Sequence, residues 1–187
     1  MPIPEDHPTD PICAYGISKL MAEKYIRLFA SEQGMHSVIL RIANPYGENQ
    51  DPKRPQGAVS VFLDRATTGG EISLWGDGSV VRDYIYQEDV GQAVAAVMAS
   101  PDAEGIYNLG SGQGHSLSEV LGAVEAVLGR RIAVNHLAGR SFDVPFNVLD
   151  CSRLQGHSSW RPSTSLTQGI TRMLEARDRG AAQHPGR

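Results

Sequence analysis

A helical segment that leads directly into a short strand is the feature that most constrains how this chain can fold. From about Tyr15 to Glu32 the apolar residues recur at helical spacing, and Gly34 follows as a stop signal. Residues 37–42, Ser-Val-Ile-Leu-Arg-Ile, are few, β-branched and closed by the turn-forming residues Asn-Pro-Tyr-Gly, which predicts a buried strand. A helix followed at once by a strand implies α/β layering.

The same alternation continues through the rest of the chain. Helices are predicted at residues 58–67, 88–99, 116–128 and 165–176, and strands at residues 72–75, 80–86, 106–109 and 132–134. The helix from Ser116 has a capping box, because Ser116 can cap the free amides while Glu119 reaches back to it. An open sheet with helices on its faces, joined to a smaller and more irregular C-terminal portion, is the expected architecture.

Composition and cysteine usage exclude several classes of protein. A chain of 187 residues with 41% hydrophobic content is typical of globular proteins. Cys13 and Cys151 lie far apart, so neither a disulfide framework nor a zinc site is predicted. No apolar run approaches about 18 residues and the N-terminus is polar, so we expect a cytoplasmic protein without membrane contact. The net charge of -4, with acids and bases interspersed, gives no face for nucleic acid.

Two other patterns are poor candidates for a site. Residues 110–114, Gly-Ser-Gly-Gln-Gly, invite a phosphate-loop interpretation, but their spacing is neither GxGxxG nor that of a Walker loop. A turn that feeds the Ser116 cap explains them better. The six histidines are dispersed without close helical pairing, so we predict no metal.

The pair Tyr15 and Lys19 is the strongest candidate for chemistry. Four residues apart near a helix start, the two side chains project from one face and can meet the same ligand. A nearby ammonium favours the phenolate over the phenol, which would let Tyr15 act as a general acid or base. The spacing also occurs by chance, and a packed tyrosine beside a solvated lysine is the alternative on pattern alone.

Successive motifs along the chain support the interpretation of Tyr15 and Lys19 as a chemical pair. Residues 14–23 (Ala-Tyr-Gly-Ile-Ser-Lys-Leu-Met-Ala-Glu), 40–47 (Leu-Arg-Ile-Ala-Asn-Pro-Tyr-Gly) and 75–85 (Trp-Gly-Asp-Gly through Arg-Asp-Tyr-Ile) stand in the chain in that order. They are followed by residues 107–112, 140–145 and 160–170. In this order the motifs resemble those of the NAD-dependent epimerase/dehydratase family, extended short-chain dehydrogenases/reductases that act on nucleotide sugars. The resemblance covers the chain from about Pro11 to Met173.

The resemblance implies a role for each matching residue near the cofactor. Tyr15 would exchange a proton with a sugar hydroxyl, and Lys19 would bind the nicotinamide ribose of NAD and tune the tyrosine. The backbone at Ile42 and Ala43 would lie close to the nicotinamide.

On the substrate side, the resemblance implies that Asn44 hydrogen-bonds a nucleotide-diphosphate sugar; closing a turn is its structural alternative. Arg82 and Arg140 would hold the pyrophosphate, with Asp143 orienting Arg140 or a ribose hydroxyl. Solvated surface arginines are the alternative for this pair. Trp75 could stack near the nucleobase or belong to the core.

The resemblance also implies a division of the chain. Residues 1–56 would carry the catalytic helix and a strand of a dinucleotide-binding domain, residues 57–178 mainly the substrate-binding portion, and residues 179–187 a disordered tail. The fold class is then α/β, the C-terminal part of a Rossmann-like parallel sheet plus a smaller mixed α/β domain. Family members place the NAD pyrophosphate on a glycine-rich turn that precedes the tyrosine, and only fourteen residues precede Tyr15. We therefore expect this chain alone to bind NAD poorly and to show no turnover.

Three functions fit these expectations. The favoured one is the C-terminal half of a nucleotide-sugar 4-epimerase, in which Tyr15 deprotonates the sugar while hydride passes from C4 to NAD and leaves a 4-keto intermediate. The others are a fragment of a nucleotide-sugar 4,6-dehydratase and a non-catalytic binding or oligomerisation remnant. Exposure of the strand edge and of the apolar helix face predicts self-association, as a homodimer or larger, or association with a separate N-terminal half.

Overall fold

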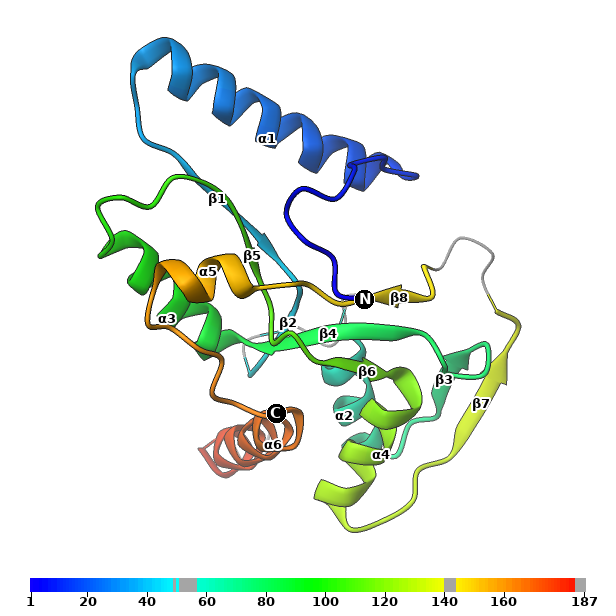
Figure 1. Cartoon of the computed structure of the whole chain (residues 1–187). Helices are drawn as coiled ribbons and strands as arrows, with labels where there is room; N and C mark the ends of the chain where they lie inside the picture. The colour runs from blue at the N-terminus through cyan, green and yellow to red at the C-terminus, as the bar shows by residue number, and fades with distance from the viewer. Residues whose placement is uncertain (49, 51–56, 140–143, 184–187) are drawn as a thin grey trace.

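The computed structural model describes residues 1–48, 50, 57–139 and 144–183, and these form an α/β structure (Figure 1). The helices are α1 (Ala14–Gln33), α2 (Ala58–Thr68), α3 (Gln87–Met98), α4 (Leu117–Leu128), α5 (Ser152–His157) and α6 (Leu166–Gln183). The strands are β1 (Val38–Ile42), β2 (Asn44–Tyr46), β3 (Ile72–Trp75), β4 (Val81–Tyr86), β5 (Gly105–Leu109), β6 (Gly114–Ser116), β7 (Val134–Leu137) and β8 (Phe146–Asn147).

Local signals fix the ends of the two helices that the sequence defines best. Helix α1 ends at Gly34, which takes the left-handed conformation with φ of 61° and donates its N–H to Ala30. At the start of α4, the Ser116 hydroxyl accepts from the Glu119 N–H at 3.1 Å, and the Glu119 carboxylate accepts from the Ser116 N–H at 2.7 Å. The capping box predicted from the sequence is therefore confirmed.

The strands form three small sheets in which parallel pairing predominates. Strand β1 pairs with β5, in the register Val38 with Gly105, and β3 pairs with β7. The sheet between them has the order β2-β4-β6, with β8 pairing with β4 as well. Only the β4–β6 pair is antiparallel among these ladders. The α/β class with a parallel sheet is confirmed.

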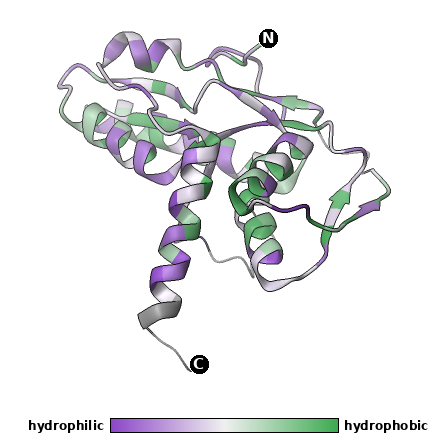
Figure 2. Ribbon diagram, turned by 90° about the horizontal axis from the view of Figure 1, so that it is seen from below, coloured by the Kyte–Doolittle hydropathy of each residue, from purple (hydrophilic) through white to green (hydrophobic). Residues whose placement is uncertain are grey.

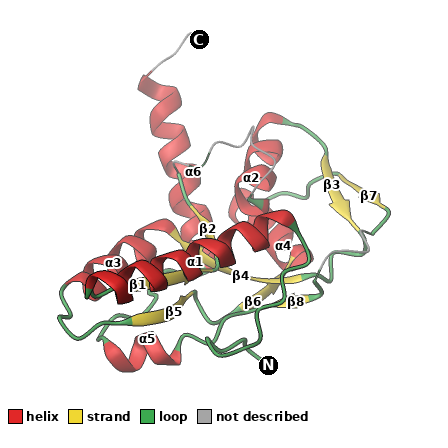
Figure 3. Cartoon of the chain, turned by 90° about the horizontal axis from the view of Figure 1, so that it is seen from above, coloured by secondary structure: helices red, strands yellow, loops and turns green. Residues whose placement is uncertain are grey.

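Strand β4 separates two hydrophobic cores, because alternate side chains of a strand point to opposite faces. Ile85 packs in one core with α3, α5 and β5, and Tyr84 and Tyr86 pack in the other with α2, α4 and α6. Strand β1 divides in the same way, with Val38 and Leu40 against the first core and Arg41 bonded to α1. Seen from above, α1 crosses over the β1 strand (Figure 3).

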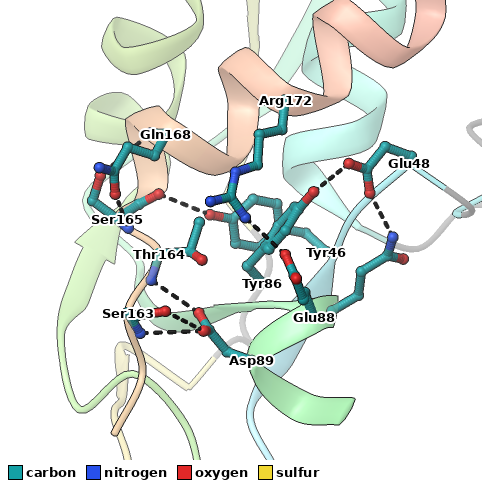
Figure 4. Close-up of polar contacts among 11 residues, drawn as sticks. Tyr46, Glu48, Tyr86, Glu88, Asp89, Ser163, Thr164, Ser165, Gln168 and Arg172 are labelled. Atoms are coloured by element: carbon teal, nitrogen blue, oxygen red, sulfur yellow. Dashed lines mark hydrogen bonds and ion pairs between the residues drawn. The ribbon is translucent and has the colours of Figure 1, made fainter. Parts of the chain in front are cut away.

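Helix α6 is tied to the body by polar contacts at its start (Figure 4). The buried carboxylate of Asp89 accepts from the Ser163 hydroxyl at 2.9 Å and from the Thr164 N–H at 3.0 Å. Arg172 pairs with Glu88 at 2.8 Å, which links the first turns of α6 to α3. Arg177 pairs with Asp64 of α2 at 2.9 Å, and past this contact the helix projects from the rest of the molecule (Figure 2).

Several boundaries differ from the sequence expectations. Strand β7 begins at Val134, where residues 132–134 were expected, because its register follows its pairing with β3, Ile72 with Val134. Helix α6 continues to Gln183, past the expected end at 176 and into the segment 179–187 expected to be disordered. No proline stands between Ser165 and Pro185 to stop it, and an isolated glycine such as Gly180 is tolerated in a helix.

Helix α1 is unusually exposed for an amphipathic helix. Ala30 is its one fully buried residue, while Met21, Tyr25, Leu28 and Phe29 are each more than half exposed. The exposed apolar helix face expected from the sequence is therefore present. Within the described residues, no helix has the length and hydropathy needed to cross a membrane.

Candidate active site

A cavity of about 350 Å³ lies between β2, β3, β4 and the first residues of α2 and α4. It brings together three of the residues predicted to bind substrate, Asn44, Trp75 and Arg82, from three different strands. Apolar and aromatic side chains form most of the remaining lining, together with Gly57: Pro45, Tyr46, Ala58, Val59, Val80, Tyr84 and Leu117. A mostly apolar cavity with a few convergent polar groups is typical of small-molecule sites.

Asn44 enters this cavity from β2, which pairs with β4 in the register Asn44 with Tyr84. Its carboxamide nitrogen donates to the backbone carbonyl of Asp83 at 2.8 Å. One end of the amide is thereby fixed, although the residue remains exposed. The bond leaves the side-chain oxygen of Asn44 as an acceptor.

Arg82 supplies positive charge to the same cavity. Its guanidinium donates to the carbonyls of Val81 at 2.9 Å and Val144 at 2.6 Å. Among the described residues, no carboxylate forms an ion pair with it. Burial raises the pKa of the neighbouring Tyr84 phenol to about 12, and the charge of Arg82 opposes that rise. The remaining guanidinium donors suit a phosphate.

Tyr15 and Lys19 lie together at the start of α1. The ammonium of Lys19 is 5.3 Å from the centroid of the Tyr15 ring, within the range of a cation–π contact. The Tyr15 side chain is 68% exposed. The predicted proximity of the two groups is confirmed.

The residues expected to lie near the nicotinamide, Ile42 and Ala43, are the last residue of β1 and the residue after it. Since α1 and β1 run in opposite directions, the helix starts toward the carboxyl end of that strand (Figure 1). There Ile42 is 44% exposed, and the Ala43 N–H donates to Leu109 at 2.9 Å. The described residues that line the cavity of Asn44 and Arg82 include neither Tyr15 nor Lys19. Arg140 and Asp143, also predicted site residues, lie outside the described residues.

An ion pair fixes α1 on the sheet. The Arg41 guanidinium donates two bonds to the Glu23 carboxylate, at 2.8 and 2.7 Å, and a third to the Glu5 carbonyl at 3.0 Å. The bonds to Glu23 raise the pKa of Arg41, and burial opposes this rise. Glu23 lies two helical turns after Tyr15, so the Arg41–Glu23 pair sets the position of Tyr15 along β1.

The turn at residues 110–114 uses its amides within the protein. The N–H groups of Ser111 and Gly112 donate to the Asp83 carboxylate at 2.8 and 3.1 Å, and the Gly110 N–H donates to the Cys151 sulfur. These donors are therefore not aimed at a ligand phosphate. Burial raises the pKa of the Cys151 thiol to about 12.

The sequence did not single out several residues of the cavity. Tyr84 could have been found, because it stands two residues after Arg82 on a strand and so faces the same side. Leu117 belongs to α4 and meets the cavity only through the pairing of β6 with β4, which no local pattern predicts. Within the described residues, no cluster of side chains could hold a metal ion.

Comparisons with known proteins identify the family. The model of the NAD dependent epimerase/dehydratase family matches residues 1–110. A UDP-glucose 4-epimerase from Thermotoga maritima, solved with UDP-glucose, is 34% identical with a TM-score of 0.90, over 96% of this chain and 58% of that one. A dTDP-4-dehydro-6-deoxyglucose reductase from Escherichia coli is 32% identical over 94% of this chain and 55% of its own length.

A dTDP-glucose 4,6-dehydratase from Streptomyces venezuelae, solved with NAD, is 26% identical with a TM-score of 0.87, over 98% of this chain and 56% of that one. The chain belongs to the NAD dependent epimerase/dehydratase family. It is similar to nucleotide-sugar 4-epimerases and 4,6-dehydratases, and it spans a little over half the length of these proteins.

Loss of the Arg41–Glu23 pair should loosen α1 selectively. In Glu23→Gln one charged acceptor becomes an amide, so we expect the α1 amides to exchange with deuterium about tenfold faster. Hydrogen exchange read by mass spectrometry measures this, with peptides of α4 as the internal reference. Glu32→Gln, an exposed change on the same helix, is the control. Equal exchange in both variants would show that the pair does not hold the helix.

Proposed function

We propose that this chain carries the nucleotide-sugar cavity and the proton-transfer residues of a nucleotide-sugar 4-epimerase. The observation that supports this most is the meeting of Asn44, Trp75 and Arg82 in one cavity, since these residues come from two separate motifs and three strands. The volume of about 350 Å³ lies within the range of small-molecule sites. Similarity to an epimerase solved with UDP-glucose supports the same class of ligand.

In this proposal each polar group of the cavity has one task. Arg82 binds the pyrophosphate through the guanidinium donors that its two carbonyl bonds leave over. Asn44 hydrogen-bonds the sugar nucleotide, and Trp75, 40% exposed at the end of β3, stacks near the nucleobase. Arg140 and Asp143 complete the pyrophosphate and ribose contacts.

Tyr15 and Lys19 form the proton-transfer pair of the proposed enzyme. Tyr15, as the phenolate, takes the proton from the sugar 4-hydroxyl and later returns it, and the ammonium of Lys19 stabilises the phenolate that is present before the first step and after the second. When bound, NAD would accept the hydride from sugar C4 and return it to the 4-keto sugar. The exposed ammonium of Lys19 and the exposed apolar Ile42 fit the nicotinamide ribose and ring.

We also propose that these 187 residues do not catalyse the epimerase reaction by themselves. The described residues offer donors for the nicotinamide end of NAD, but the amides of their glycine-rich turn at 110–112 are bonded to Asp83 and Cys151. A dinucleotide held only at one end is poorly oriented for hydride transfer. A separate chain that binds the rest of the dinucleotide would restore the reaction. We also propose that the protein acts in the cytoplasm.

A 4,6-dehydratase is the second candidate reaction. Its support is the similarity to the dehydratase from Streptomyces venezuelae, which has nearly the same TM-score as the epimerase. A non-catalytic binding or oligomerisation protein is the third, and the exposed face of α1 favours it.

Titration calorimetry with UDP-glucose and with a dTDP-sugar tests the cavity. We expect binding by the wild type and at least about tenfold weaker binding by Arg82→Ala, because a charged hydrogen bond to phosphate is lost. Arg161→Ala is the matched control, since the Arg161 guanidinium also donates to two backbone carbonyls but lies outside the cavity. Equal affinities of Arg82→Ala and the wild type would refute the role of Arg82.

Incubation of the chain with NAD and UDP-glucose tests its activity. We expect no UDP-galactose and no 4-keto-6-deoxy sugar by chromatography, because nicotinamide would not be held against the sugar. Formation of either product would contradict the proposed incompleteness and would identify the reaction.

Self-association through α1 is proposed as well, as a homodimer or larger assembly. Each large apolar side chain that becomes buried contributes about 1.5–3 kcal/mol, and six large hydrophobic side chains on this helix, Tyr15 among them, are more than half exposed. Sedimentation should therefore show an oligomer that Phe29→Glu weakens. Met98→Glu is the control, because Met98 is 82% exposed on α3. A monomeric wild type at high concentration would exclude this assembly.

A further inference from the structure

Asp83 is a charged residue with no exposed surface, located in β4 between Arg82 and Tyr84. One carboxylate oxygen accepts from the N–H and the hydroxyl of Ser111, at 2.8 and 2.6 Å. The other accepts from the N–H of Gly112 at 3.1 Å and of Leu149 at 3.3 Å. A buried carboxylate is stable only when it is hydrogen-bonded in this way.

These bonds gather two segments that are distant in sequence. The turn after β5 approaches so closely that a Cβ added at Gly110 would lie 2.3 Å from an Asp83 oxygen. Only glycine fits at that position without displacing the carboxylate. Leu149 belongs to the segment that follows β8, which pairs with β4 in the register Arg82 with Asn147.

The same segment also meets the guanidinium of the cavity. Val144 accepts from Arg82 at 2.6 Å, and Pro145 accepts from the Val81 N–H at 2.9 Å. Residues 144–149 are thus held at one end by Arg82 and at the other by the Asp83 carboxylate. On the same edge of β4, the Asp83 carbonyl fixes the amide of Asn44.

We propose that Asp83 is a positioning residue for the nucleotide-sugar cavity, a role that rests on the function proposed above. It touches no ligand itself, and its side chain lies on the face of β4 opposite to Arg82. Its carboxylate sets the position of β4 against the residue 144–149 segment, and so sets the direction in which Arg82 presents its remaining donors. The backbone carbonyl of Asp83 sets the orientation of the Asn44 amide. Precise placement of binding groups depends on such supporting contacts.

The test is Asp83→Asn, which keeps the size of the side chain but turns one acceptor into a donor that faces backbone N–H groups. We expect UDP-glucose to bind about tenfold more weakly, measured by calorimetry at a temperature where circular dichroism shows the variant folded. Because Asp83 acts through Arg82, Asp83→Asn should weaken binding much less when Arg82 is already alanine. If the losses of binding free energy in Asp83→Asn and Arg82→Ala were fully additive, the proposal that Asp83 acts through Arg82 would be overturned.

Asp89→Asn is the matched control. Asp89 is equally buried, and its carboxylate also accepts from two backbone N–H groups and a hydroxyl, but it ties α3 to residues 163–164 away from the cavity (Figure 4). We expect it to lower the melting temperature without changing the affinity for UDP-glucose. Equal weakening of binding by both variants would indicate general destabilisation and overturn the proposal.

Ser111→Ala keeps the test decisive if Asp83→Asn fails to fold. It removes only the hydroxyl bond to Asp83, so we expect a smaller loss of affinity, about threefold. Wild-type affinity in Ser111→Ala and in any folded Asp83→Asn would overturn the positioning role. Absence of UDP-sugar binding by the wild type is a different result, because it would refute the proposed function itself before any variant is compared.

Discussion

A carboxylate that is removed from water must find its hydrogen bonds inside the protein, and this constraint organises the chain around Asp83. The donors come from the turn after β5 and from the segment after β8, 28 and 66 residues away. Both segments are therefore bonded to the strand that lies between the two hydrophobic cores. The same strand carries Arg82 into the cavity that Arg82 and Asn44 share.

Helix α1 is attached by a different kind of contact. Its apolar side chains are mostly exposed, so the two bonds between Arg41 and Glu23 replace the burial that usually docks a helix. A partly buried bidentate pair fixes direction and register well, but it contributes less free energy than a buried apolar face. A second protein surface that covers this face would add the missing burial without moving the pair.

Local chemistry explains which parts of the fold the sequence predicted. Gly34 and the Ser116–Glu119 box mark helix ends through bonds within a few residues, and both were correct. The expected strand at 132–134 began two residues and ended three residues before β7, because the position of β7 follows from pairing with β3. The short strands β2, β6 and β8 were missed for the same reason, since their partners are distant in sequence, and β2 was expected to be a turn. The short helix α5 was also missed. Asp83 sat within a recognised motif, yet its partners could not be inferred from it.

The candidate site shows the same division between local and distant information. Tyr15 and Lys19 were predicted as neighbours from helical spacing, and they are neighbours. Asn44 stands in one motif and Trp75 and Arg82 in another, and their meeting required the pairing of β2 with β4 and the turn between β3 and β4. The described chain therefore holds two parts of the candidate site. The cavity lies among strands and helices of the described residues, of which β2 and β4 pair directly, whereas the Tyr15 side chain is 68% exposed on α1. Under the proposed function, nucleotide-sugar binding would use the cavity, and proton transfer would need the Tyr15 side chain to be covered, because an exposed phenol exchanges its proton with water rather than with a sugar.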